Sequence, residues 1–333
     1  MLREHVGVID ISNFGKYEVA GPGAGDWLDR LVANHVPREI GKSCLTPLIG
    51  MRGGVAGDFT ITMTGDDRYM MIGSGMAERY HRRFFDMVPM PDGTAIEVAT
   101  PRMAGFNVAG PRSREMLARL TDADLSNDGW PFMRSRSISV GGVACLAIRV
   151  SFTGDLGWEL HCAESDQLAL YDALLSAAAA HGGGPVGGRA LGALRIEKGY
   201  GSWGREYSPE YWPQEAGLHR LIKLDKEFLN KDAYLKISNT PPRESLTMFE
   251  VDVTEDADAN GGEPIFLSDG TPVGRVTSGA YGYSVGKSLA IGYAREGTVR
   301  AGDKVDIYIL GKPHAATVLD SPPFDAAGAR LRA

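Results

Sequence analysis

Cysteine is scarce in this chain of 333 residues, which contains only Cys44, Cys145 and Cys162. The three are widely spaced and odd in number, so they form neither a disulfide framework nor a zinc-binding spacing. This usage is typical of a reducing compartment. The seven histidines also lack the spacing of metal ligands, and we therefore predict no metal site.

The chain also lacks an excess of positive charge and a long apolar run. Its formal net charge of −7 argues against nucleic acid as a partner, because nucleic-acid binding depends on basic surfaces. No apolar run approaches the roughly 20 residues that span a bilayer. The N-terminus enters a strand pattern directly and has no signal-peptide core. We expect a soluble cytoplasmic protein that binds neither nucleic acid nor membrane.

Glycine is abundant, with 43 residues, and Gly53-Gly54 opens the most regular stretch of the chain. Residues 58–64 alternate polar and apolar side chains strictly, which predicts a half-buried strand, and residues 69–72 supply the return strand of a hairpin. Asp58 stands where the glycine-rich entry becomes the strand. Such an acid is often a solvated turn residue. It is also placed where another molecule can approach closely.

A repeat organises the region before the C-terminal third. Residues 19–22 recur as 108–111, and residues 53–56 recur as 141–144, at offsets of 89 and 88. Each copy reads strand, helix, hairpin, helix, strand, which is the split β-α-β pattern of a ferredoxin-like module. The repeat therefore predicts an α+β fold with two such modules, and by itself says nothing about chemistry.

Two acids occur in only one copy of the repeat. Asp58 corresponds to Ala147 or Leu146, depending on the offset, and Glu159 corresponds to Met70. Residues kept in both copies suit a scaffold, whereas an acid present once suits a site, although ordinary drift produces the same pattern.

The rest of the chain divides into a joint, a helix and a β-rich end. Glycine-rich residues 182–188 precede an expected helix at 190–196, and the irregular, aromatic-rich stretch 195–207 either lines a cavity or covers the core. After a break at 240–242 the period is two over six segments, which predicts a small β-barrel or sandwich domain, with a surface loop at 252–262. We predict domains at 1–100, 101–240 and 241–330, of which the first two can interleave.

Three motifs resemble the glycine-cleavage T-protein (aminomethyltransferase) family. They are Ser-Phe-Thr-Gly-Asp-Leu-Gly-Trp-Glu-Leu-His at 151–161, the stretch 195–210, and Val-Gly-Arg-Val-Thr-Ser-Gly at 273–279. The likeness is greatest to the folate-binding C-terminal region of dimethylglycine and sarcosine dehydrogenases. It implies a three-domain cloverleaf, with its two ferredoxin-like halves and β-domain around a central hole that holds tetrahydrofolate.

The resemblance also implies roles for individual residues. It assigns the catalytic role to Asp58 and the pterin-binding role to Glu159. It adds four folate-site residues: Arg195, Trp203, Phe152 and Ser74. Phe152 replaces a usual tyrosine and Ser74 a usual asparagine, so the chain departs from the family pattern at these two positions.

The function implied is a tetrahydrofolate-dependent one-carbon transfer. The chain carries no flavin-binding segment, so we expect a separate flavoprotein subunit to oxidise an N-methylated amine such as dimethylglycine or sarcosine. The iminium, or formaldehyde from it, would then be captured as 5,10-methylene-tetrahydrofolate. The alternatives are direct methyl transfer from an onium or methoxy donor, and a folate-binding protein without transferase activity. The related iron–sulfur assembly proteins carry a cysteine after Lys-Gly, whereas Tyr200 follows Lys198-Gly199 here.

Overall fold

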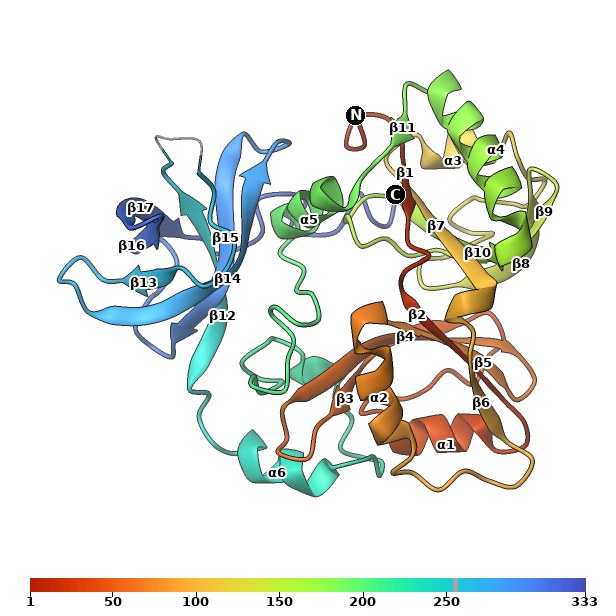
Figure 1. The fold of residues 1–333 in the computed structure, drawn as a ribbon, viewed down its shortest axis with the longest axis horizontal. Helices are drawn as coiled ribbons and strands as arrows, with labels where there is room; N and C mark the ends of the chain where they lie inside the picture. The colour runs from red at the N-terminus through yellow and green to blue at the C-terminus, as the bar shows by residue number, and fades with distance from the viewer. Residues whose placement is uncertain (254–256) are drawn as a thin grey trace.

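The computed structural model describes residues 1–253 and 257–333. It contains two open sheets and one closed barrel. Figure 1 shows the barrel on one side and the two sheets stacked on the other, in the arrangement of a cloverleaf. The chain begins with one strand of one sheet, builds the other sheet, and then completes the sheet in which it began. It continues into the barrel, and its C-terminal segment runs back from the barrel to the sheets.

The first sheet has the strand order β3-β4-β5-β2-β6. Its elements are β2 (Gly15–Ala20), α1 (Ala24–Leu31), β3 (Ser43–Ile49), β4 (Val55–Gly65), β5 (Arg68–Gly73), η1 (Gly75–Ala77), α2 (Glu78–Phe85) and β6 (Ala95–Val98). Both helices cover one face, where Trp27 and Phe85 are buried with Phe59 of β4. The strict alternation of residues 58–64 thus forms a strand, as predicted, and Asp58 lies inside β4 rather than in a turn.

The second sheet has the order β11-β1-β7-β10-β9-β8. Its elements are β1 (Gly7–Asp10), β7 (Met103–Ala109), η2 (Thr100–Arg102), α3 (Ser113–Leu117), β8 (Ser135–Val140), β9 (Val143–Ile148), β10 (Gly157–Ala163), η3 (Glu164–Asp166), α4 (Gln167–Ala180) and β11 (Gly184–Pro185). The N-terminal strand β1 lies between β7 and β11, so the first segment of the chain belongs to the second sheet. The predicted domain boundaries at about residues 100 and 240 stay a prediction. The place of β1 in the second sheet means that the first two regions interleave.

The predicted duplication is confirmed by the strand orders. The strands of the two copies follow the same order: β4-β5-β2-β6 in the first sheet, and β9-β10-β7-β11 in the second, where β1 is inserted between β7 and β11. Each copy adds one edge strand, which is β3 in the first sheet and β8 in the second. The shared glycine before each first helix is required by geometry. Gly21 and Gly110 have φ of 119° and 131°, and an added Cβ would lie 2.1 Å from the Gly93 oxygen and 2.5 Å from the His5 oxygen.

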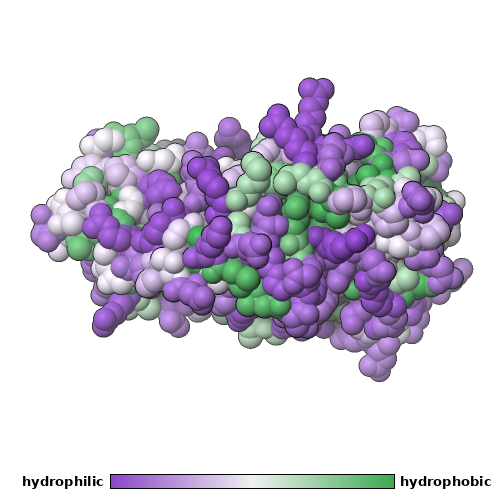
Figure 2. Space-filling model, turned by 90° about the horizontal axis from the view of Figure 1, so that it is seen from below, coloured by the Kyte–Doolittle hydropathy of each residue, from purple (hydrophilic) through white to green (hydrophobic). Residues whose placement is uncertain are grey.

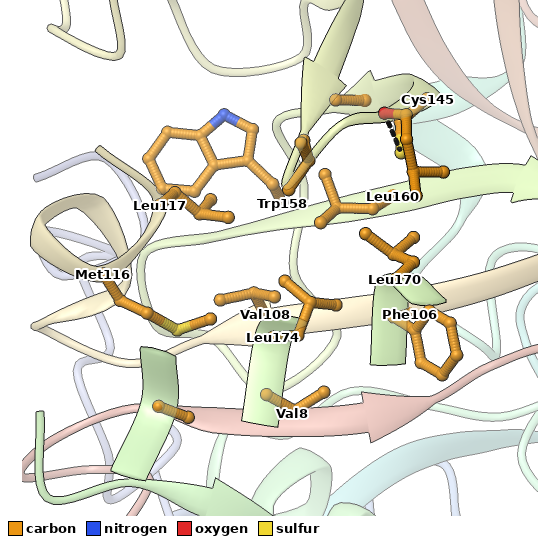
Figure 3. Close-up of a cluster of buried hydrophobic side chains, with 14 of the residues drawn as sticks. Val8, Phe106, Val108, Met116, Leu117, Cys145, Trp158, Leu160, Leu170 and Leu174 are labelled. Atoms are coloured by element: carbon orange, nitrogen blue, oxygen red, sulfur yellow. Dashed lines mark hydrogen bonds between the residues drawn. The ribbon is translucent and has the colours of Figure 1, made fainter. Parts of the chain in front are cut away.

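The core of the second half shows which way β10 faces. Trp158 and Leu160 point from β10 into a cluster with Val108 of β7 and Leu174 of α4 (Figure 3). Because side chains alternate across a strand, Glu159 and His161 project from the opposite face. That face is turned away from the helices α3 and α4.

The six predicted C-terminal strands form a closed barrel rather than a sandwich, in the order β12-β15-β14-β13-β16-β17. They are β12 (Glu244–Val251), β13 (Pro264–Phe266), β14 (Pro272–Gly282), β15 (Lys287–Arg295), β16 (Lys304–Ile309) and β17 (Lys312–Val318). Part of the predicted surface loop at 252–262, residues 254–256, lies outside the described residues.

Two helices and a 3₁₀ turn connect the sheets to the barrel. They are α5 (Gly188–Glu197), η4 (His219–Leu221) and α6 (Lys231–Ser238). In Figure 1, α5 lies between the second sheet and the barrel. The helix α5 confirms the one expected at 190–196. No pattern predicted α6, whose eight residues bury only Tyr234 and are too few to give a clear apolar period.

The surface seen from below is mostly hydrophilic, with hydrophobic residues gathered in a short band near its middle (Figure 2). Scattered exposed apolar residues are usual on folded proteins. Over the described ranges, no helix combines the length and apolarity that crossing a bilayer requires.

Candidate functional site

A cavity of about 1890 Å³ lies where the two sheets and the barrel meet. Its wall includes Asp58 from the first sheet, Glu159 from the second and Ser278 from the barrel. The structure brings all six sequence-predicted site residues to this wall: Asp58, Ser74, Phe152, Glu159, Arg195 and Trp203. Both single-copy acids therefore border the same space.

Asp58 is held near one end of β4. The printed register pairs Thr60 with Ile72, and extending it by two residues places Asp58 opposite Ser74, just beyond the end of β5. The carboxylate is half-buried, and its Oδ1 has no hydrogen-bond partner among the described residues. Burial raises the pKa of Asp58 from 3.8 to about 6, because leaving water disfavours the charged form.

Trp203 and Tyr207 lie on the loop that follows α5. Trp203 packs on Tyr80 of α2, with ring centroids 5.8 Å apart, and meets the ring of His81 at 5.4 Å. Burial raises the pKa of Tyr207 well above its usual range, and the neighbouring Asp58 charge adds to this shift. The aromatic stretch therefore lines the cavity instead of only covering the core.

The shape of this loop is fixed by Glu206, which is fully buried. Its carboxylate accepts hydrogen bonds from Arg195 at 2.8 Å, from the Ser202 backbone N–H at 2.9 Å and from the Thr277 hydroxyl at 2.7 Å. A buried carboxylate with three donors is well satisfied. Glu206 thus ties the loop to both α5 and the barrel.

Arg195 also joins three elements. Besides Glu206, its guanidinium donates to the Ser278 hydroxyl of β14 at 2.6 Å and to the Tyr200 carbonyl at 2.9 Å. All these contacts are with protein groups, so Arg195 braces α5, the loop and the barrel. Its contact with a folate stays a prediction.

Phe152 reaches the cavity from the segment between β9 and β10. Its ring is stacked on that of Tyr200, with centroids 6.2 Å apart and planes at 17°. The phenylalanine therefore keeps the aromatic contact expected at this position, but it lacks the hydroxyl that a tyrosine would present.

Glu159 is flanked by buried polar residues that the sequence reasoning did not single out. Asn107 lies opposite it on β7, and the Nε2 atom of His161 lies 3.6 Å from its carboxylate. Lys16 donates to the backbone carbonyls of Ser12 and Phe14, each at 3.0 Å. Burial lowers the pKa of Lys16 to about 8, and the nearby charge of Glu159 offsets part of this lowering.

Only one signal in the sequence could have pointed to this cluster. Lys16 is a charged residue on the strand β2, where it is fully buried, and a lysine is almost never buried without partners. Within the described parts of the chain, no three His, Cys, Asp or Glu side chains gather as metal ligands would.

Two family models match the chain. The GCVT N-terminal domain matches residues 1–226, and the glycine cleavage T-protein C-terminal barrel domain matches residues 245–325. Together they cover both open sheets and most of the barrel.

Curated relatives and a solved structure agree with this match. Mitochondrial dimethylglycine dehydrogenase of Mus musculus is 34% identical over 99% of this chain, and an aminomethyltransferase of Desulforamulus reducens is 28% identical over 96% of it. The chain spans 38% of the length of the dehydrogenase and 87% of the aminomethyltransferase. A crystal structure of aminomethyltransferase T from Bartonella henselae is 23% identical and superimposes with a TM-score of 0.86. The match covers 98% of this chain and 88% of that chain, so the fold is shared.

Proposed function

Because the chain belongs to the glycine cleavage T-protein family, we propose that it is a tetrahydrofolate-dependent one-carbon transferase of the aminomethyltransferase type. In this proposal it captures the one-carbon unit of a small N-methylated amine, of the dimethylglycine or sarcosine type, as 5,10-methylene-tetrahydrofolate. The observation that carries the proposal is one cavity bordered by two acids, each present in a single copy of the repeat.

The residues present suit a reduced folate. A pterin offers adjacent N–H donors, and the group recorded nearest to the Glu159 carboxylate among the described residues is Nε2 of His161, at 3.6 Å. Hydrogen bonds to a charged group contribute about 1.5–3 kcal/mol each, so a pterin would offset the cost of burying Glu159. Trp203 and the stacked Phe152 and Tyr200 offer apolar surface to the flat rings of the same ligand.

The bound folate supplies the nitrogen nucleophiles that accept the one-carbon unit. The ionised Asp58 stabilises the positive charge that develops at the reacting nitrogens and accepts or holds a proton there. Its raised pKa makes it a better base than an ordinary aspartate near neutral pH. No covalent bond to the protein is required.

A separate flavoprotein supplies the oxidation in this proposal. An N-methyl amine gives up two electrons and a proton to a flavin and becomes an iminium, or releases formaldehyde after hydrolysis. The similarity to dimethylglycine dehydrogenase covers 38% of that protein's length. Co-purification of this chain with a flavin-containing protein supports the arrangement, and demethylation by this chain alone refutes it.

The product of a folate-dependent assay tests the function. The chain, tetrahydrofolate, dimethylglycine or sarcosine and the co-purifying flavoprotein are incubated, and the folate products are separated by mass. We expect 5,10-methylene-tetrahydrofolate, with turnover lost in D58A and folate binding retained. A 5-methyl product indicates direct methyl transfer instead, and folate binding without turnover on any methyl donor indicates a non-catalytic binding protein.

A further inference from the structure

A layer of polar side chains is buried behind Glu159. Lys16, Asn107, Glu159 and His161 are between 0% and 7% exposed. Asn107 of β7 and Glu159 and His161 of β10 alternate with the core residues of Figure 3 and so project from the opposite side of the second sheet, whereas Lys16 comes from β2 of the first sheet. Burying several polar groups together is costly unless they satisfy one another or a ligand.

Glu159 and His161 are alternate residues of β10 and so project from the same face. The Nε2 atom of His161 lies 3.6 Å from Oε2 of Glu159, just beyond hydrogen-bond length. The room for the imidazole comes from Gly105, directly opposite on β7, where an added Cβ would lie 2.9 Å from Nδ1 of His161. The backbone is therefore shaped to accept a ring beside Glu159.

The polar groups of this pair are not used within the protein. Neither ring nitrogen of His161 has a hydrogen-bond partner among the described residues. Within the described residues, no group donates a hydrogen bond to the Glu159 carboxylate. The one ion-pair contact of Glu159 there is with His161. Only Glu159 of the two borders the cavity.

Lys16 cannot take the place of His161 as a directional partner. Its ammonium donates to the backbone carbonyls of Ser12 and Phe14, each at 3.0 Å, and lies 3.5 Å from that of Ile11. These contacts hold the charge against the segment between β1 and β2. Lys16 thus contributes positive charge to the surroundings of Glu159, and His161 is left as the group that can orient the carboxylate.

We propose that His161 is a positioning residue for Glu159: its Nε2 side holds one edge of the carboxylate at the inner wall, so that Glu159 presents its acceptors to the pterin N–H groups. This inference rests on the proposed function, because it needs a folate in the cavity. His161 itself does not touch the ligand. Its effect on binding must therefore pass entirely through Glu159.

A double-mutant cycle on folate affinity tests this dependence. Anaerobic calorimetry gives the tetrahydrofolate Kd of the wild type, H161F, E159Q and the double variant E159Q/H161F, with melting temperatures to verify folding. Groups in contact usually couple, so we expect H161F to raise Kd by about tenfold in the wild type and by less than about twofold in E159Q. H161Q, whose amide nitrogen can replace Nε2, should recover most of the affinity.

The matched control is H314F, which alters a buried histidine of the barrel that does not border the cavity. H314F should leave Kd unchanged. An equal loss from H161F in both backgrounds, or an unchanged Kd in E159Q, overturns the positioning role while leaving the proposed function intact. A wild-type protein that binds no tetrahydrofolate overturns the proposed function first, and the positioning role with it.

Discussion

The two halves of the repeat share a strand order but surround their acids differently. In the first half, Asp58 lies at the cavity with an enclosed Oδ1, and the burial that raises its pKa is not offset by a nearby cation. In the second half, Glu159 lies beside Lys16 and His161. The burial of Asp58 suits a group that exchanges a proton. The Glu159 carboxylate, with the positive charge of Lys16 nearby, suits a group that accepts hydrogen bonds from a ligand.

The difference shows how a duplicated scaffold acquires distinct chemistry. The acids are on different strands of the repeat, Asp58 on β4 and Glu159 on β10. In the repeat alignment Asp58 falls on Leu146 or Ala147 and Glu159 on Met70, all of them apolar residues. Each half therefore keeps an apolar residue where the other half has its acid. One cavity then receives one carboxylate from each half.

The sharpest way to separate the two acids is to neutralise Asp58. We expect D58N to lower kcat by about 10²- to 10⁴-fold, the range for loss of a proton-transfer group, while the folate Kd changes little. Steady-state kinetics and calorimetry measure the two effects. D66N, at an exposed position in the turn after β4, is the matched control and should retain wild-type kcat. A large loss of affinity in D58N would mean that the two halves do not divide their roles.

Neutralising Glu159 should give the reverse pattern. An amide in its place pairs poorly with two donors, so we expect E159Q to raise the folate Kd by about 10- to 100-fold. At saturating folate, kcat should stay within a few-fold of the wild type. E164Q, at an exposed residue of η3, serves as the control. Loss of kcat in E159Q with an unchanged Kd would contradict this division of roles between the two acids.

The pH dependence of catalysis should report the ionisation of the Asp58 carboxyl. Its folded pKa is raised to about 6, so the carboxyl is protonated below that pH and ionised above it. If the ionised form is active, kcat/KM, which reports the groups of the free enzyme, rises about tenfold per pH unit up to about 6 and then levels off. D58N should remove this limb from its residual activity. A limb that persists in D58N would assign the titration to another group.

The smallest expected effect is on stability. The ionised Asp58 is costly to bury, so folding is penalised once the pH exceeds the ordinary pKa of 3.8, and most above about 6. We expect D58N to melt a few degrees above the wild type at pH 8, with the difference shrinking as the pH falls from about 6 toward 4. Calorimetric melting across this range measures it, and a constant difference would argue against a buried charge.

Much of the fold followed from local patterns in the sequence. The alternation at 58–64 gave β4, the repeated Gly-Pro turns gave equivalent strand–helix connections, and the period of two after residue 242 gave the barrel strands. The insertion of β1 between β7 and β11 could not be predicted, because pairing between strands distant in sequence leaves no local period. The helix α6 was missed because its eight residues are too few to give a clear apolar period.

The candidate site divides in the same way. The single-copy acids and Trp203 were chosen from the repeat and the family resemblance, and the structure places them on one cavity. The partners of these residues were not predictable. Glu206 binds Arg195, and His161 approaches Glu159, through distances set by how strands and loops pack in three dimensions. A sequence motif names such residues without showing which of them touch.

A crystal structure of this chain with tetrahydrofolate tests the central claim most directly. The account predicts a pterin ring in the shared cavity, with its N–H groups on Glu159 and its reacting nitrogens beside Asp58. A folate bound at the same site but with its pterin away from Glu159, or one bound outside the space between the two halves, would contradict it.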